Sequence, residues 1–181
     1  KINESINDDI CAVMVAKKNI DLDQTNDIET IINTDLKKQH TISEYDKKIF
    51  KYINPIGTPA GFIFKRRTDI SFDEHYYPSS DYKFISELSK FGKIIYINLP
   101  LAYVGIGYND SKKISVIDGF IKNDHKIRRD LGCNHLISSI LSFMQKHKYY
   151  IEWRYSRSLF SLLMSVVYKI ISKILIMIYT K

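Results

Sequence analysis

Cysteine is scarce in this sequence, and its scarcity argues against two kinds of protein. The only two cysteines, Cys11 and Cys133, lie far apart and match no disulfide or metal-ligand spacing. The five histidines are also scattered without paired spacing. The pattern therefore predicts free thiols in a reducing compartment, and neither a disulfide scaffold nor a zinc domain.

The first residues do not follow the pattern of a secretory leader. "KINESINDD" is polar and acidic where such a leader needs a basic and then an apolar run. We therefore expect the protein to stay in the cytoplasm. Motifs of a serine nucleophile elbow and of a glycine-rich phosphate loop are missing as well.

Acidic residues are nearly absent from the last third of the chain. After Asp130 the only acid is Glu152, and it stands against seven lysines and arginines. The formal net charge of +7 is therefore largely a property of this end, whereas the first 46 residues are rich in acids. This position favours an anionic surface as the partner of the C-terminal region.

The apolar residues, at 45 %, are ordinary for a folded domain and are arranged in short alternating blocks. Strands and helices that alternate in this way predict an α/β fold. We expect strands at 10–16, in "GFIFKR" after a Pro/Gly loop, and at 93–99, where Pro100 closes the strand. We expect helices over 43–53 behind Ser43, from an N-cap at Ser80 to a stop at Gly92, and beyond the polar loop 101–115.

Asp81 is the candidate site residue, and two interpretations of it remain open. An acid in the first turn of a helix interacts favourably with the helix dipole, which is worth about 0.3 to 1 kcal/mol. Alternatively, a carboxylate among tyrosines and close to a glycine-rich loop has the surroundings of a base that faces a polyhydroxylated substrate.

The order of three blocks carries a resemblance to a known family. "PIGTPAGFIFKRR" is followed by "FDEHYYPSSDYKFISELSKFGKIIYINLPLAYV" and then by "NDSKKIS". This order resembles the acceptor-side half of the family 2 glycosyltransferases, which have the GT-A fold. The resemblance covers about residues 10–115.

The resemblance implies a partial GT-A-like mixed sheet with flanking helices, followed by C-terminal amphipathic helices. Asp81 takes the place of the family's catalytic aspartate, which deprotonates the acceptor hydroxyl so that it attacks the anomeric carbon with inversion. The loop of residues 54–61 would shape the sugar site. The substrate-binding residues expected on this basis are Gly57, Thr58, Pro59, Gly61, Ser80 and Tyr82.

The chain also departs from the family pattern. Ser80 stands where members usually carry a glutamate before the aspartate. Members need a nucleotide-sugar donor and a divalent cation, Mg or Mn, held by an Asp-x-Asp after an apolar strand. "DLD" at 21–23 follows polar residues, so a solvated turn is the preferred interpretation. We therefore expect a fragment that lacks the nucleotide-binding half and is inactive alone.

The C-terminal segment from Leu159 to Thr180 is long enough to cross a bilayer, but two lysines in its middle are costly in hydrocarbon. Ser161, Ser165, Lys169, Ser172 and Lys173 form one narrow polar stripe. We expect an interfacial helix that, with aromatic and basic residues from 149 onward, holds the protein on an anionic membrane. A helix packed on its own domain and an aromatic nucleic-acid surface are the alternatives, and we expect no nucleic acid to bind.

These observations predict an acceptor-side domain over 1–120 and a basic helical tail over 121–181. The expected function is sugar transfer from a nucleotide-sugar to a glycan or lipid-linked acceptor in surface polysaccharide biosynthesis. The protein would lie on the inner face of the cell membrane. The alternative is a non-catalytic, membrane-associated α/β module.

Overall fold

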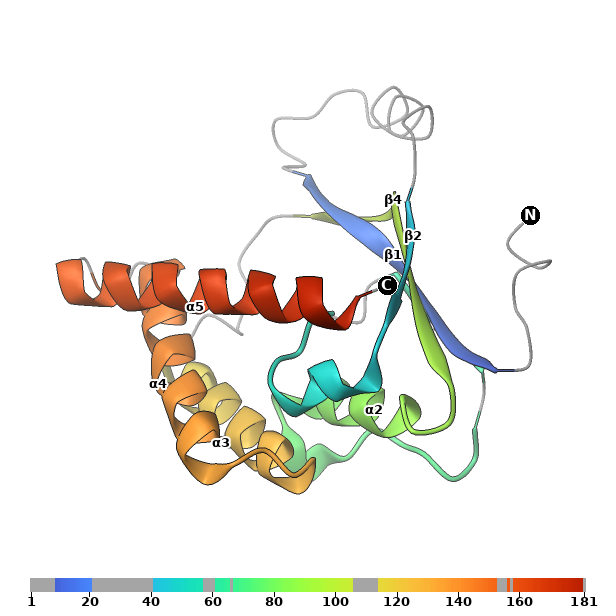
Figure 1. The fold of residues 1–181 in the computed structure, drawn as a ribbon, viewed down its shortest axis with the longest axis horizontal. Coiled ribbons are helices and arrows are strands. Elements are labelled where there is room, and N and C mark those ends of the chain that lie inside the picture. Colours follow the sequence, from blue (N-terminus) through green and yellow to red (C-terminus); the bar gives the residue numbers. More distant parts are fainter. Residues whose placement is uncertain are drawn as a thin grey trace.

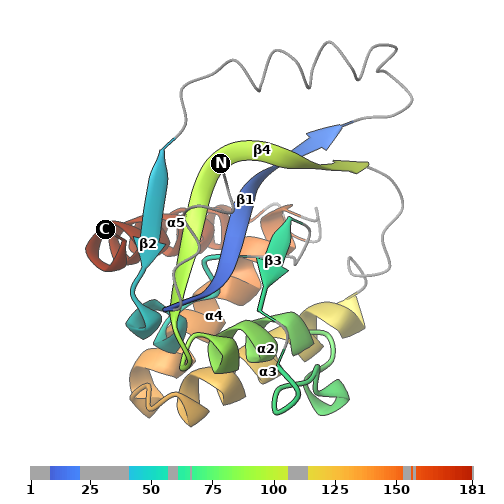
Figure 2. The same ribbon diagram turned by 90° about the vertical axis from the view of Figure 1, so that its right-hand side faces the viewer.

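The computed structural model describes residues 9–20, 41–56, 61–65, 67–105, 114–152, 156 and 158–180. In these residues the fold is α/β, with a four-stranded mixed sheet and four α-helices. The helices lie together on one side of the sheet (Figures 1 and 2).

The sheet has two long central strands and two short edge strands. Its order is β2-β4-β1-β3. The central strands β1 (Ile10–Ile20) and β4 (Lys93–Gly105) are parallel. The edge strands β2 (Ile42–Tyr45) and β3 (Phe62–Phe64) run antiparallel to β4 and β1, respectively. The apolar run that predicted the first strand is buried from Cys11 to Val15, as expected for a strand in the centre of the sheet.

Pro100 does not end its strand, and that expectation was wrong. β4 continues to Gly105, and the register against β1 shifts where Ala16 pairs with Pro100. β2 pairs only with Ile94 to Ile97 of β4. Proline is tolerated at bulges and where no neighbouring strand needs its missing N–H, so β4 passes through this position.

The helix expected over 43–53 is present only in part, and its predicted start at Ser43 was wrong. Ser43 lies in β2 and pairs with Tyr96 of β4. Asp46, and not Ser43, caps the short 3-10 helix η2 (Lys47–Lys51), since its Oδ1 accepts a hydrogen bond from the Lys48 N–H at 2.9 Å. Pairing with β4 overrides the local helical spacing.

α2 (Ser80–Leu88) follows the single turn η3 (Glu74–Tyr76) and is shorter than predicted. Its N-cap is Ser79 and its C-cap is Ser89, so Ser80 is the first helical residue. Gly92 begins the approach to β4 instead of ending the helix. A side chain there would meet the carbonyl oxygen of Asp9, which explains the glycine.

The remaining helices are α3 (Ile114–Asp130), α4 (His135–Glu152) and α5 (Leu159–Tyr179). Helices were expected in this region. α3 and α5 share the core of the sheet, because Ile127 of α3 is buried in it and Leu175 and Ile176 of α5 pack against it, whereas α4 forms a separate small cluster with α5. The boundary predicted between residues 120 and 121 falls inside α3.

The C-terminal end of α5 is attached to the edge strand β2. The Asp46 N–H donates to the Tyr179 carbonyl at 2.8 Å, and Tyr45 forms a β-bridge with Thr180. The rings of Tyr52 and Tyr179 stack with centroids 6.0 Å apart. α5 therefore runs from α4 at its start to the sheet at its end (Figure 1).

Candidate functional site

Asp81 lies in the first turn of α2 and is partly exposed. Its Oδ1 accepts a hydrogen bond from the Tyr82 N–H at 2.8 Å. The first N–H groups of a helix have no intrahelical acceptor, and the helix dipole favours an anion there. The local geometry thus suits an ionised carboxylate, which both interpretations of Asp81 require.

The segment that leads into α2 is fixed by α3. Asn123 donates from Nδ2 to the Tyr77 carbonyl at 2.7 Å. Gly119 lies against Pro78, where an added Cβ would come within 2.9 Å of the proline Cδ. These contacts determine where α2 begins and hence where Asp81 sits. Sequence reasoning missed them, although a glycine inside a helical pattern is a known sign of close packing.

Tyr82 differs from its expected role at the substrate site. Its side chain is 1 % exposed, and its hydroxyl donates to the Phe50 carbonyl at 2.5 Å. Burial raises its pKa well above the usual value. Successive helical residues point about 100° apart, so Tyr82 enters the core while Asp81, one position earlier, stays partly exposed. Ser80 is partly exposed as well.

Gly61 is required by the backbone of the sheet. Its φ is +79°, its carbonyl accepts a hydrogen bond from the Val15 N–H at 3.0 Å, and an added Cβ would lie 2.7 Å from Val15 Cγ2. Glycine is the residue that tolerates this conformation and this approach. Gly57, Thr58 and Pro59 lie outside the described residues. Of the substrate-binding residues predicted in the sugar loop, the structure therefore describes only Gly61.

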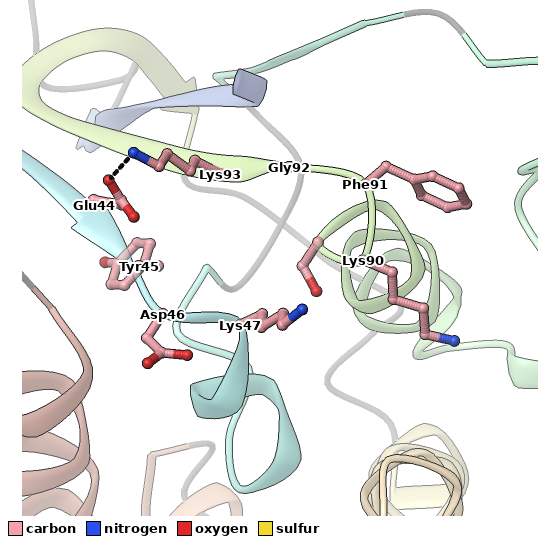
Figure 3. A pocket seen from close by; sticks show the side chains of 9 residues that line it. Glu44, Tyr45, Asp46, Lys47, Lys90, Phe91, Gly92 and Lys93 are labelled. Carbon is pink, nitrogen blue, oxygen red and sulfur yellow. Dashed lines mark ion pairs between the residues drawn. The ribbon is translucent and has the colours of Figure 1, made fainter. Parts of the chain in front are cut away.

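A cavity of about 440 Å³ lies between the end of β2, the start of η2 and the turn from α2 into β4. Figure 3 shows Lys93 directed at Glu44, with Nζ 3.2 Å from Oε2, and Lys47 extending towards the end of α2. This cavity is at the amino ends of the parallel strands. Ligands of open α/β sheets bind at the carboxyl ends, so its position does not favour a substrate site.

A second cavity, of about 530 Å³, is formed by residues 69–75 with Lys83, Glu87 and Phe91. Its acids are largely engaged with bases: Arg67 donates to Asp69 at 2.8 Å, and Lys83 donates to Glu87 at 2.9 Å. The side-chain hydrogen bond from His75 lowers the pKa of Asp73. Neither cavity is lined by Asp81.

The described residues bring no group of three or more His, Cys, Asp or Glu side chains together as a metal site. Asp21 and Asp23 lie outside this part of the chain. Both cysteines are buried free thiols, and burial raises the pKa of Cys11 to about 11, which leaves it an unreactive thiol at neutral pH.

Between α3 and α4 lies a set of side chains that we call the buried polar seam: Asp124, Arg128, Ser138, Ser142 and Gln145. Arg128 is fully buried and donates to Ser142 Oγ at 2.6 Å and to Gln145 Oε1 at 3.1 Å. Gln145 Nε2 in turn donates to Asp124 Oδ2 at 2.6 Å. Burial raises the pKa of Asp124, and the charge of Arg128 opposes that rise.

The polar stripe predicted on α5 is divided between two faces. Ser161 and Ser165 are buried, whereas Lys169 and Lys173 are exposed. The outward face is instead apolar. Nine large side chains on it are 44 to 81 % exposed: Leu159, Phe160, Leu162, Leu163, Val166, Ile170, Ile174, Met177 and Ile178.

α5 is long and apolar enough to cross a membrane by length and composition, and only 17 % of its most apolar window is buried. Its composition is therefore suited to membrane association. The alternative of a helix packed on its own domain is realised in part, because one face contacts α4 while the opposite face remains open.

Comparisons were made with protein families, curated proteins and solved structures. None of them matches this chain. The assignment of a function therefore depends on the geometry described above and on the order of the sequence blocks.

Proposed function

We propose that the chain supplies the acceptor side of an inverting glycosyltransferase, with Asp81 as the base that takes the proton from an acceptor hydroxyl. The observation that carries the proposal is the position of Asp81, a partly exposed carboxylate in the first turn of α2. The contacts that α3 makes with Tyr77 and Pro78 fix the segment before Asp81, and this supports the proposal. A general base must be held within hydrogen-bond reach of the proton it removes.

Donor binding and charge neutralisation of the leaving diphosphate belong to other groups in this proposal. A divalent cation is expected for enzymes of the resembled family, but the described residues do not fit a metal site. The role proposed for this chain is therefore confined to the acceptor. Gly61 allows the backbone to enter β3, and Asp81 accepts the proton.

The test is sugar transfer by a chimera in which a donor-binding half of a family 2 glycosyltransferase precedes residue 1. Asp81→Asn should lower kcat by about 10² or more, since general-base catalysis typically contributes 10² to 10⁴. Glu74→Gln, which removes an exposed acid from the preceding turn, is the matched control and should retain activity. Equal transfer by the Asp81→Asn variant and the parent chimera would contradict the assignment.

We further propose that the protein lies on the inner face of the cell membrane, where a lipid-linked acceptor in surface polysaccharide biosynthesis would be found. Support comes from the exposed apolar face of α5 and from Lys169 and Lys173 beside it. An interfacial helix presents an apolar face to lipid and basic residues to anionic headgroups.

Sedimentation with anionic vesicles tests this attachment, and Ile170→Asp should lower binding strongly. Deletion of α5 is a less suitable variant, because Leu175, Ile176 and Tyr179 pack against the core of the sheet. Vesicle binding by Ile170→Asp equal to that of the unaltered protein would contradict attachment through α5.

A second function is favoured by two observations. Ser80 replaces an expected acid, and Asp81 lines neither of the two cavities described above. Both agree with a non-catalytic, membrane-associated α/β module. Inactive chimeras that still bind vesicles through α5 would support this module over the enzyme.

A further inference from the structure

α4 carries an exposed apolar stripe that the sequence interpretation did not assign. Leu136, Ile137, Ile140 and Phe143 are 45 to 67 % exposed. They follow one another at i, i+1, i+4 and i+7, which places them on one face of the helix. Contiguous apolar surface of this kind marks an interaction site.

The other faces of α4 already have partners. Ser138, Ser142 and Gln145 face α3 through the buried polar seam. Leu141 and Met144 form a small apolar cluster with Tyr168 of α5. Within the residues that the structure describes, the stripe is thus the face of α4 that remains open.

The α4 stripe is continuous with the exposed face of α5. The ring of Phe143 lies with its centroid 6.2 Å from that of Phe160, which is itself 54 % exposed. His147 packs edge-on against Phe160, with the ring centroids 5.3 Å apart. The two helices therefore present one connected surface that bends where they meet.

The charge of this region selects the kind of partner. α5 contains no acidic residue, and the one acid of α4 is Glu152 at its end, which pairs with Lys148 at 3.8 Å and with Lys169 at 3.1 Å. Lys146 and Lys148 lie on α4, and Lys169 and Lys173 lie on α5. An apolar surface accompanied by bases is complementary to an anionic bilayer, which offers both acyl chains and negative headgroups.

We propose that α4 is a second lipid-contacting helix, whose stripe enters the acyl–headgroup boundary of an anionic membrane beside α5. The inference rests on the membrane attachment proposed through α5. It adds a separate surface, so the protein would be held by two crossing helices instead of one.

Three matched substitutions separate the two surfaces, each changing an exposed isoleucine to aspartate in the full chain. Ile140→Asp alters the α4 stripe, Ile170→Asp alters α5, and Ile42→Asp alters the edge strand β2 as the control. Binding to phosphatidylcholine–phosphatidylglycerol vesicles is measured by sedimentation, and circular dichroism checks the fold. Ile140→Asp and Ile170→Asp should each lower partitioning about tenfold or more, because each removes a buried apolar contact with lipid.

The outcomes are distinct. A loss with Ile170→Asp and with Ile140→Asp, against wild-type binding by Ile42→Asp, supports the proposal. A loss with Ile170→Asp alone overturns it and leaves the attachment through α5 intact. No vesicle binding by the unaltered protein overturns both. A dimer that Ile140→Asp dissociates, with vesicle binding unchanged, would assign the stripe to a second copy and also overturn the proposal.

Direct contact is tested by fluorescence. Trp153 is the only tryptophan, so a Trp153→Phe background allows a single reporter to be placed at position 140 or 42. With brominated acyl chains, Ile140→Trp should be quenched severalfold more than Ile42→Trp. Equal quenching at the two positions would refute lipid contact by α4.

Discussion

The helical layer of α3, α4 and α5 buries more polar side chains than the sheet side of the molecule does, although both bury apolar residues. Around the sheet, most buried residues are apolar, such as Met14 of β1, Ile94 of β4 and Leu88 of α2. In the helical layer, Arg128, Gln145 and Ser165 lie inside, while leucines, isoleucines and phenylalanines of α4 and α5 face outward.

The difference lies in what each region buries and what it exposes. The sheet and α2 follow the rule of a protein in water, where the hydrophobic effect places apolar side chains inside. Small and hydroxylated residues between helices, with apolar residues outside, are typical of helices that pack in an apolar medium. The sheet side is therefore stabilised mainly by apolar burial, and the helices add the buried polar seam to an apolar interior that includes Leu141, Met144 and Tyr168.

The largest effect is expected from Arg128→Ala, which removes the centre of the polar interior. Loss of one partner from a buried charged network costs about 3 to 5 kcal/mol. Without Arg128, the side-chain oxygen of Gln145 loses its hydrogen-bond donor, and Asp124, which is bonded to Gln145, loses the connection to a positive charge. Urea denaturation measures the free energy of unfolding. Arg129→Ala, at the exposed neighbour, is the control, and equal losses for the two would contradict a polar interior.

Next in size is a pair of leucine truncations, one in each region. Leu88→Ala should lower the free energy of unfolding by about 2 to 5 kcal/mol, since Leu88 is fully buried. Leu163→Ala, at an exposed position of α5, should change it by about 0.5 kcal/mol or less in water. A similar loss at both positions would show that the contrast between the regions is not real.

A smaller effect is expected from single lysines of α5. Lys173→Gln should weaken binding to anionic vesicles about fivefold, as each basic residue near such a surface contributes about 1 kcal/mol. Lys122→Gln of α3, which makes the same charge change at another exposed position, should have little effect. High salt should remove the difference between them, and a difference that persists would argue against an electrostatic origin.

The smallest effect concerns the pH dependence of stability. Burial raises the pKa of Asp124 in the folded state, so the native protein binds the proton more tightly than the unfolded chain. Its stabilising contribution is present below the unfolded pKa, about 3.9, and is lost as pH rises through the folded pKa. The unfolding free energy of wild type relative to Asp124→Asn should therefore fall as pH rises from about 4, and a rise would contradict the assignment.

Local patterns predicted most of the elements. The apolar run after Ile10, the "GFIF" segment and the block around Phe84 each formed the expected strand or helix. The errors at Ser43 and Pro100 have one cause, since both positions are decided by pairing with a strand distant in sequence. Helical spacing and a proline are local signals and contain no information about that pairing.

The candidate site was predictable only in its central residue. Asp81 follows from its place before an apolar helical pattern, but Tyr82 was assigned to the same site without regard to its direction. The contacts of Gly119 and Asn123 with the segment before α2 join residues more than 40 positions apart. The seam around Arg128 was missed because composition does not distinguish a buried arginine from an exposed one.

The attachment of Tyr179 and Thr180 to β2 limits how far the body of the protein can stand from a bilayer. Because the C-terminal end of α5 is bonded to β2, a docked α5 could not act as a long tether and would hold this end of β2 close to the headgroups. An enzyme so placed would reach sugars next to the lipid and would miss the distant tip of a long glycan.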